Sequence, residues 1–158
     1  MAGKHRKHPC AAYVMLFMLI GLIGWFSGQQ GKTSHGMSVW VSEKVVEMVD
    51  CEAKLELHDK QFRRLVHYLD KPIRKSAHLI EYALAGGILY AIVSCYVGRG
   101  WKRIGMVIVL LAVLGGIDEL HQLFVMGRDG KWQDVAVDVC GGMIGMGIGG
   151  FFCDWTKG

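Results

Sequence analysis

Apolar and polar residues alternate along the chain in long blocks. Four stretches of roughly 20 residues are mostly apolar, and most of the charged residues lie between them. About 20 apolar residues are enough to cross the hydrocarbon core of a bilayer as a helix. The pattern therefore predicts four transmembrane helices, which we place at about residues 9–27, 76–97, 104–126 and 132–152.

The long segment between the first and second spans, residues 28–75, is more polar but still patterned. Two groups of apolar residues in it repeat at the spacing of one helix face: Phe62, Leu65, Val66 and Leu69, and before them Val45, Val46 and Val49. This spacing predicts one or two amphipathic helices that lie on the outer membrane surface or across the bundle. Pro72 is predicted to end the last of them just ahead of the second span.

Together these patterns predict an all-α membrane protein in a single domain of residues 1–158. It has four transmembrane helices and an amphipathic helical outer segment between the first and the second. Of its residues, 52% are hydrophobic and 20% are charged, which argues against a disordered chain. The length of 158 residues argues against a large multidomain enzyme. The five cysteines form no CxxC pair and have no zinc-ligand spacing, so no metal ligand is assigned from them.

The orientation in the membrane follows from the basic residues in the short flanks. Lys4, Arg6 and Lys7 precede the first span, and the link of residues 98–103 holds three more cations. Because such residues gather on the cytoplasmic side, we expect a multi-pass protein with both termini in the cytoplasm. Residues 28–75, with nine cations and seven acids, then lie outside. The alternative for the first span is a secretory signal peptide.

Several polar residues lie inside the apolar blocks, where a charged side chain is costly and usually faces the bundle interior or water. The second span holds His78, Glu81 and Tyr82, the third Asp118, Glu119, His121 and Gln122, and the fourth Asp134 and Asp138. With the predicted topology they lie near the outer ends of three helices. We therefore expect them to form one polar pocket that faces outward.

The fourth span carries its polar residues on the same face as two glycines. Asp134, Asp138, Gly141 and Gly145 follow one another at i, i+4, i+7 and i+11. Small residues allow helix backbones to approach closely, so this stripe predicts tight helix packing below the polar pocket. Gly86, Gly87, Gly115 and Gly116 are candidates for the same role on the neighbouring helices.

Two interpretations of the polar residues stay open at this point. They form either a structural network of ion pairs or a pocket that binds or transforms a ligand, with Arg74, Lys75 and Arg128 as available cations. The sequence has no HExxH pair, GxSxG elbow or phosphate-binding P-loop. The glycine-rich run of residues 141–150 lies inside an apolar span and predicts helix packing. No feature favours nucleic acid as a partner.

Two parts of the sequence, Arg74–Tyr90 and Asp118–Gly145, resemble the VanZ-like family of bacterial membrane proteins. The family pattern is roughly KxxHFxxYxxL, then DExxQxFxxxR, then Dxxx(N/D)xxGxxxG. The matching residues are Lys75, His78, Tyr82, Asp118, Glu119, Gln122, Phe124, Arg128, Asp134, Asp138, Gly141 and Gly145. The chain departs from the pattern with Leu79 in place of Phe, Ala85 in place of Leu, and Asp138 where Asn is common.

The resemblance implies a protein of the bacterial cell membrane, linked in some members to resistance against the glycopeptide teicoplanin. The leading hypothesis is a pocket that binds an envelope lipid or a lipid-linked precursor of the cell wall. Lys75 and Arg128 would hold an anionic headgroup, and His78, Asp118 and Glu119 would serve as hydrogen-bonding or acid/base groups. The remaining ligand-binding candidates are Tyr82, Gln122, Asp134 and Asp138.

Two alternatives to this hypothesis remain. The first is an intramembrane hydrolase or transferase that acts on the lipid, with acid/base groups or metal ligands drawn from His78, Glu81, Asp118, Glu119 and Asp134. The second is a membrane scaffold without catalysis, in which ion pairs only hold the helices together. Any cofactor stays unassigned.

Overall fold

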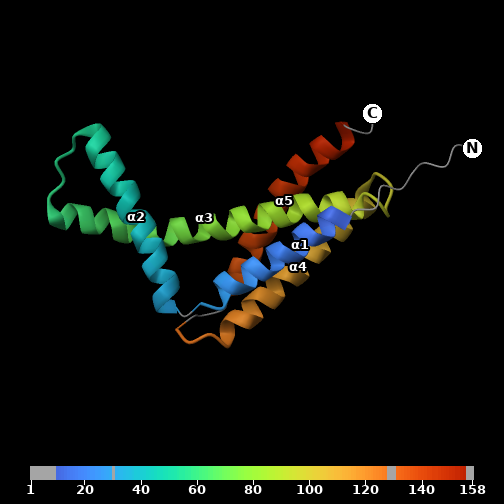
Figure 1. Cartoon of the computed structure of the whole chain (residues 1–158), viewed down its shortest axis with the longest axis horizontal. Helices are drawn as coiled ribbons and strands as arrows, with labels where there is room; N and C mark the ends of the chain where they lie inside the picture. Colours follow the sequence, from blue (N-terminus) through green and yellow to red (C-terminus); the bar gives the residue numbers. More distant parts are fainter. Residues whose placement is uncertain (1–9, 30, 128–130, 156–158) are drawn as a thin grey trace, which may run out of the picture.

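The computed structural model describes residues 10–29, 31–127 and 131–155, the side chains of 31–33 and 153–155 excepted. These residues form five α-helices joined by short connections (Figure 1). The helices are α1 (Cys10–Ser27), α2 (Gly31–Ala53), α3 (Asp59–Val93), α4 (Trp101–Leu123) and α5 (Trp132–Trp155). The prediction of an all-α fold is confirmed, since every described element is a helix.

Four of these helices, α1, α3, α4 and α5, are long and apolar enough to cross a membrane. Most residues of their apolar windows are not buried inside the protein, and large side chains such as Phe17 on α1 and Phe152 on α5 are exposed. In water such a surface would be unfavourable, but it suits contact with lipid acyl chains. The chain is therefore an integral membrane protein with four spanning helices.

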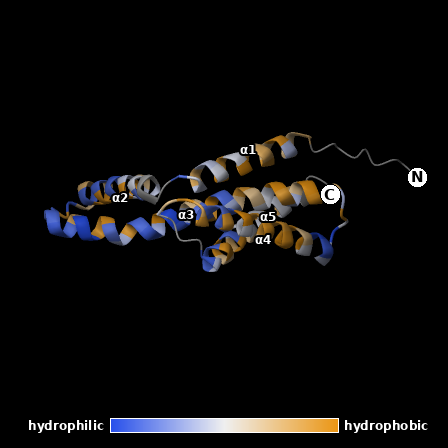
Figure 2. Cartoon of the chain, turned by 90° about the horizontal axis from the view of Figure 1, so that it is seen from below, coloured by the Kyte–Doolittle hydropathy of each residue, from blue (hydrophilic) through white to orange (hydrophobic). Residues whose placement is uncertain are grey.

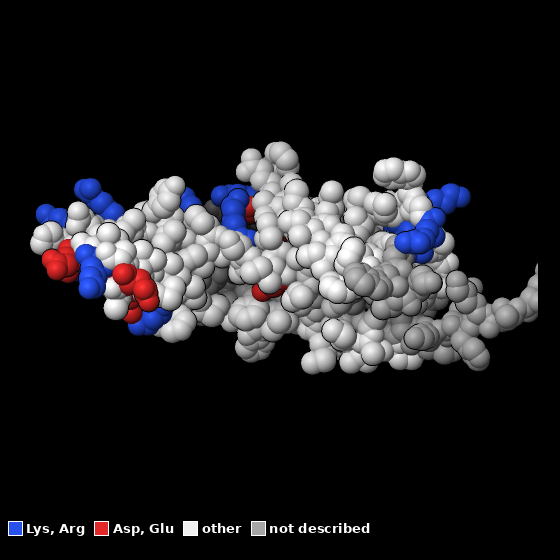
Figure 3. Space-filling view, turned by 90° about the horizontal axis from the view of Figure 1, so that it is seen from above, with Lys and Arg blue, Asp and Glu red and all other residues white. Residues whose placement is uncertain are grey.

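The helix α2 and the first part of α3, up to about Lys75, form a polar arm that extends away from the other helices (Figures 1 and 2). Most of the visible acidic side chains and many basic ones gather on this arm (Figure 3). Val46 and Val66, one from each predicted apolar stripe, are buried where α2 packs against α3. The segment between the first and second spanning helices thus holds two amphipathic helices that pack on each other.

Pro72 lies inside α3 and does not end it, so this part of the prediction is wrong. A proline in a helix removes one backbone hydrogen bond and clashes with the preceding turn, which costs about 3 kcal/mol. Tertiary contacts on both sides of Pro72 offset this cost. Asp70, two residues before it, contacts α2, while Leu79 and Ala83, further along α3, pack against the glycines of α5.

The contact between α2 and α3 is polar and centres on Asp70, which is buried. The carboxylate of Asp70 accepts a hydrogen bond from the Ser38 hydroxyl, and lies 2.9 Å from Nδ1 of His35 and 3.3 Å from Nη2 of Arg74. Asp70 precedes the predicted span at residues 76–97. Burial raises the pKa of its carboxyl, but the Ser38 hydrogen bond and the Arg74 and His35 charges outweigh burial and lower the pKa below its usual value. The ionised form of Asp70 therefore fastens α2 to α3.

The helices α3 and α5 pack most closely, through the glycine stripe of α5. A Cβ atom added at Gly141 would lie 2.5 Å from the carbonyl oxygen of Leu79, and one added at Gly145 would overlap the carbonyl of Ala83. Gly149 lies against Gly87 in the same way. Because these contacts are backbone against backbone, only glycine fits, and the predicted packing role of the stripe is confirmed.

The other glycines of the prediction behave differently from one another. Gly86 contacts the backbone of α5, and Gly115 of α4 lies against Asp138. Gly116 has no neighbouring atom within 4 Å of an added Cβ, so the packing role predicted for it is wrong. Gly115 and Gly116 follow each other in the sequence, and adjacent helical residues point to different faces.

Arg103, near the start of α4, is buried and does not act as a free flanking charge. Its guanidinium donates hydrogen bonds to the carbonyl oxygen of Val97, at 3.0 Å, and to the hydroxyl of Tyr90, at 3.1 Å. It also lies 5.2 Å from the centre of the Tyr90 ring. This contact ties the start of α4 to the end of α3 and to the connection between them.

Candidate functional site

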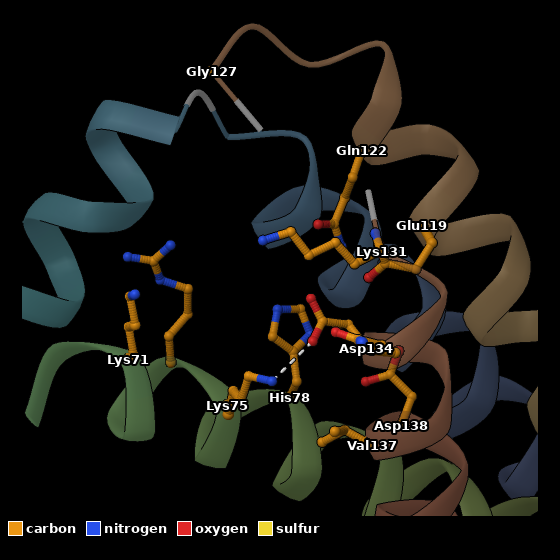
Figure 4. A pocket seen from close by; sticks show the side chains of 12 residues that line it. Lys71, Lys75, His78, Glu119, Gln122, Gly127, Lys131, Asp134, Val137 and Asp138 are labelled. Atoms are coloured by element: carbon orange, nitrogen blue, oxygen red, sulfur yellow. Dashed lines mark hydrogen bonds and ion pairs between the residues drawn. The ribbon is translucent and has the colours of Figure 1, made fainter. Parts of the chain in front are cut away.

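A polar cavity of about 400 Å³ opens where α3 passes the end of α4 and the start of α5 (Figure 4). Its lining comes from three parts of the chain that lie far apart in the sequence. The lining residues are Lys71, Arg74, Lys75, His78, Glu119, Gln122, Gly127, Lys131, Gln133, Asp134, Val137 and Asp138. We call it the polar cavity.

Four basic side chains border the polar cavity: Lys71, Arg74 and Lys75 on α3, and Lys131 just before α5. The Nζ atom of Lys75 lies 3.1 Å from an oxygen of Asp134, as the dashed line in Figure 4 marks. Both side chains are partly exposed, so this ion pair contributes little to stability. The remaining basic groups make this side of the cavity suited to an anion.

Acidic side chains reach the polar cavity from the opposite side, on α4 and α5. An oxygen of Glu119 accepts a hydrogen bond from the backbone N–H of Lys131, at 2.7 Å. Free N–H groups and the positive end of the helix dipole favour a carboxylate at a helix start. Glu119 therefore fixes the start of α5 against the end of α4, which sets the width of the cavity.

At the wall of the polar cavity, three carboxylates lie together in the interior. Asp118 and Glu119 of α4 and Asp138 of α5 each place an oxygen within 4.8 Å of the other two, and all three are buried. Asp118 also accepts a hydrogen bond from Gln122, at 2.9 Å. The side chain of Tyr82 from α3 is fully buried, and the charges of the three carboxylates act on it. We call the three acids the carboxylate cluster.

A second cavity, of about 250 Å³, lies between the end of α1, α2 and α3. Its lining is mostly apolar and includes Phe26, Met37, Val41, Ile73 and Ala77, together with Ser34, Ser38 and Glu81. Arg74 and His78 line both this cavity and the polar cavity. The second cavity, here called the apolar cavity, is therefore a direct neighbour of the polar cavity along α3.

The structure brings most of the predicted site residues together. Lys75, His78, Glu119, Gln122, Asp134 and Asp138 line the polar cavity, while Asp118 and Tyr82 lie buried behind it. Glu81 lines the apolar cavity instead, with an oxygen 4.0 Å from Nδ1 of His78. His121 is exposed and its ring contacts Gly28 at the end of α1. Arg128 lies outside the described residues.

Two basic residues of the cavity were not among the predicted site residues, Lys71 and Lys131. Lys71, Lys75, His78 and Tyr82 follow each other at i, i+4, i+7 and i+11, which is one face of a single helix. This signal was present in the sequence, but it crosses Pro72, where we expected the helix to end. Lys131 carries no such signal, because its place depends on how the connection between α4 and α5 folds.

The model of one protein family, VanZ/LLP1, matches residues 12–152. The chain belongs to the VanZ/LLP1 family. The match covers most or all of every spanning helix and the residues that line both cavities, so the VanZ/LLP1 resemblance found in two parts of the sequence is confirmed. Neither the curated proteins nor the solved structures contain a match to the chain. Family and helix composition together identify a multi-pass membrane protein of the VanZ/LLP1 type.

Proposed function

We propose that the polar and apolar cavities together bind one envelope lipid or lipid-linked wall precursor. The observation that carries this proposal is the sharing of Arg74 and His78 by the two cavities. An amphiphilic molecule needs a polar site in contact with an apolar site. A water-soluble ligand would fill only the polar site. The polar cavity would take the headgroup, and the apolar cavity the first part of an acyl or prenyl chain.

The charges of the polar cavity favour a headgroup with a phosphate. Lys71, Arg74, Lys75 and Lys131 offer several donors to an anion, and Arg74 can bind two phosphate oxygens at once. Glu119 and Asp134 on the other side accept hydrogen bonds from hydroxyl or amine groups of the same headgroup. A volume of about 400 Å³ lies in the range of small-molecule sites.

The topology predicted from the basic flanks places this headgroup site at the outer side of a bacterial cell membrane. In that orientation the arm of α2 and α3 lies outside, next to the site. The link to teicoplanin that the family resemblance implies then has a direct basis, because the protein would bind a lipid-linked component of the same cell envelope. Arg128, which follows α4 in the sequence, is a further cation proposed for this headgroup.

Lipid binding by the purified chain tests this proposal. The full chain in dodecyl maltoside is mixed with phosphatidylglycerol or phosphatidylcholine, and bound lipid is counted by native mass spectrometry. We expect a preference for the anionic lipid that the double variant Lys71→Gln/Lys75→Gln loses by about tenfold. The matched control, Lys60→Gln/Arg63→Gln, removes two exposed cations from the same helix away from the cavity and should bind as the wild type does.

Two outcomes would contradict the proposal. One is an equal loss of lipid binding in both double variants, which would mean that only the overall charge of α3 matters. The other concerns Glu119→Gln and Arg128→Ala. If both leave lipid binding and the teicoplanin sensitivity of expressing cells unchanged, at normal expression, the cavity has no such role.

A further inference from the structure

The carboxylate cluster of Asp118, Glu119 and Asp138 is too crowded to be explained by hydrogen bonds alone. Each of the three side chains is no more than 7% exposed, and their oxygens lie within 4.8 Å of one another. Three buried carboxylates at this separation repel each other, and little water is available to screen them. A cation or bound protons must therefore balance the cluster.

Two buried oxygen atoms have no hydrogen-bond partner among the described residues. They are Oδ2 of Asp138, within the cluster, and the hydroxyl oxygen of Tyr82, which is fully buried on α3. Tyr82 lies one helical turn after His78, which lines the polar cavity together with Glu119 and Asp138. A buried oxygen that lacks a partner is costly, by about 1–3 kcal/mol. A bound cation would give both oxygen atoms a partner.

We propose that the carboxylate cluster, with Tyr82 beside it, binds one hard divalent cation, for which Ca²⁺ is the best fit. Three oxygens within 4.8 Å of one another can reach one ion of this kind, because oxygen ligands lie about 2.3–2.6 Å from Ca²⁺ and about 2.0–2.1 Å from Mg²⁺. Ca²⁺ is the better fit because the described donors all belong to the protein, whereas Mg²⁺ usually keeps several of its waters.

The composition of the cluster disfavours softer metal ions. Its described donors are all oxygen atoms, whereas zinc and copper sites favour imidazole or thiolate groups. Glu119 and Asp138 line the polar cavity as well, so a cation reaches the cluster from that cavity and lies at its floor. The inference does not depend on the lipid proposal, since the ion is bound by this chain's own side chains.

Calcium titration of the purified full chain tests this site without any added lipid. The protein in dodecyl maltoside is stripped with a chelator and titrated with Ca²⁺ or Mg²⁺ in a calorimeter. We expect one Ca²⁺ per chain, bound more tightly than Mg²⁺, and a loss of about tenfold or more in Ca²⁺ affinity for Asp138→Asn. The matched control is Glu52→Gln, an exposed acid on α2 outside both cavities, which should lose no more than about threefold.

Thermal unfolding separates loss of the site from loss of the fold. Saturating Ca²⁺ should raise the Tm of the wild type and of Glu52→Gln, because the ion binds only the folded chain. Without Ca²⁺, Asp138→Asn should unfold no earlier than the wild type, since it removes one of three repelling charges. Ca²⁺ should then leave the Tm of this variant unchanged. Asp118→Asn provides a second variant for the same comparison.

Two results would overturn the inference. One is a wild-type chain that takes up no Ca²⁺ at about 1 mM, the weak end of known sites, which would show that protons balance the cluster. The other is equal Ca²⁺ affinity in Asp138→Asn and the wild type. Loss of Ca²⁺ binding with the lipid preference intact refutes only the cation site, and the reverse refutes only the lipid proposal.

Discussion

The backbone contact between α3 and α5 makes a quantitative prediction for Gly141→Ala. The added Cβ would lie 2.5, 3.0 and 3.2 Å from the carbonyl oxygen, Cα and carbonyl carbon of Leu79, all of them backbone atoms. No side-chain rotation relieves such an overlap, so α5 must move away from α3 by about 0.9 Å to reach an ordinary contact of about 3.4 Å. Forced overpacking of this kind costs about 1–3 kcal/mol.

A control on the same helix removes the other effect of the substitution. Replacing glycine by alanine also favours the helix itself, by up to about 1 kcal/mol. Gly147→Ala has this benefit without the clash, because no atom lies within 4 Å of its added Cβ. The difference between the two variants therefore isolates the helix contact, and we expect Gly141→Ala to be less stable than Gly147→Ala by about 1–3 kcal/mol.

Reversible unfolding in mixed micelles of dodecyl maltoside and sodium dodecyl sulfate measures both variants, with helix content followed by circular dichroism. Because Lys75 and His78 on α3 face Asp134 and Asp138 across this contact, Gly141→Ala should also weaken ligand binding in the polar cavity. Equal stability of the two variants, within about 0.5 kcal/mol, would refute the close approach of α3 and α5.

The remaining predictions concern the two ends of the bundle. Arg103→Met removes hydrogen bonds to Tyr90 and Val97, and should lower the free energy of unfolding by about 1–3 kcal/mol in the same micelle assay; an unchanged value would exclude a stabilising role. Asp70→Asn should loosen α2 from α3, seen as a broader distance distribution between spin labels on the two helices. Acidification should loosen the wild type in the same way and leave Asp70→Asn unaffected. The reason is that the pKa of Asp70 is lowered in the folded chain. Its stabilising contribution is therefore full above the unfolded pKa of about 4 and is lost as the pH falls through the lower folded value.

Pro72 shows how one local rule limited the prediction of the site. Taken alone, a proline ends a helix, and the sequence contains nothing that outweighs this rule locally. The contacts that do so are tertiary: Asp70 with α2 before the proline, and Leu79 and Ala83 with α5 after it. With the helix ended at Pro72, Lys71 fell outside the predicted face, although its spacing to Lys75 and His78 is that of one helix face.

Which residues form the site was easier to predict than how they divide into two cavities and a buried cluster. Polar residues in apolar helices are costly in lipid, so their convergence near the ends of three helices followed from the sequence. Their separation into a polar cavity, an apolar cavity and a buried cluster did not. Glu81 and Tyr82 are neighbours in the sequence, yet Glu81 lines the apolar cavity and Tyr82 is fully buried in the core. One residue along a helix turns the side chain by about 100°, and only the packed neighbours decide what each face meets.

By itself, the sequence determined the four spanning helices, the polar segment between the first two of them and the glycine stripe of α5. These depend on the length and period of apolar runs, which are local properties of the chain. Only the tertiary structure decided that α3 continues through Pro72, that Gly141 and Gly145 meet the backbone of α3, and that Asp138 joins Asp118 and Glu119. The physical reason is the same in each case. A contact between residues far apart in the chain depends on helix approach and rotation, and the whole bundle sets these together.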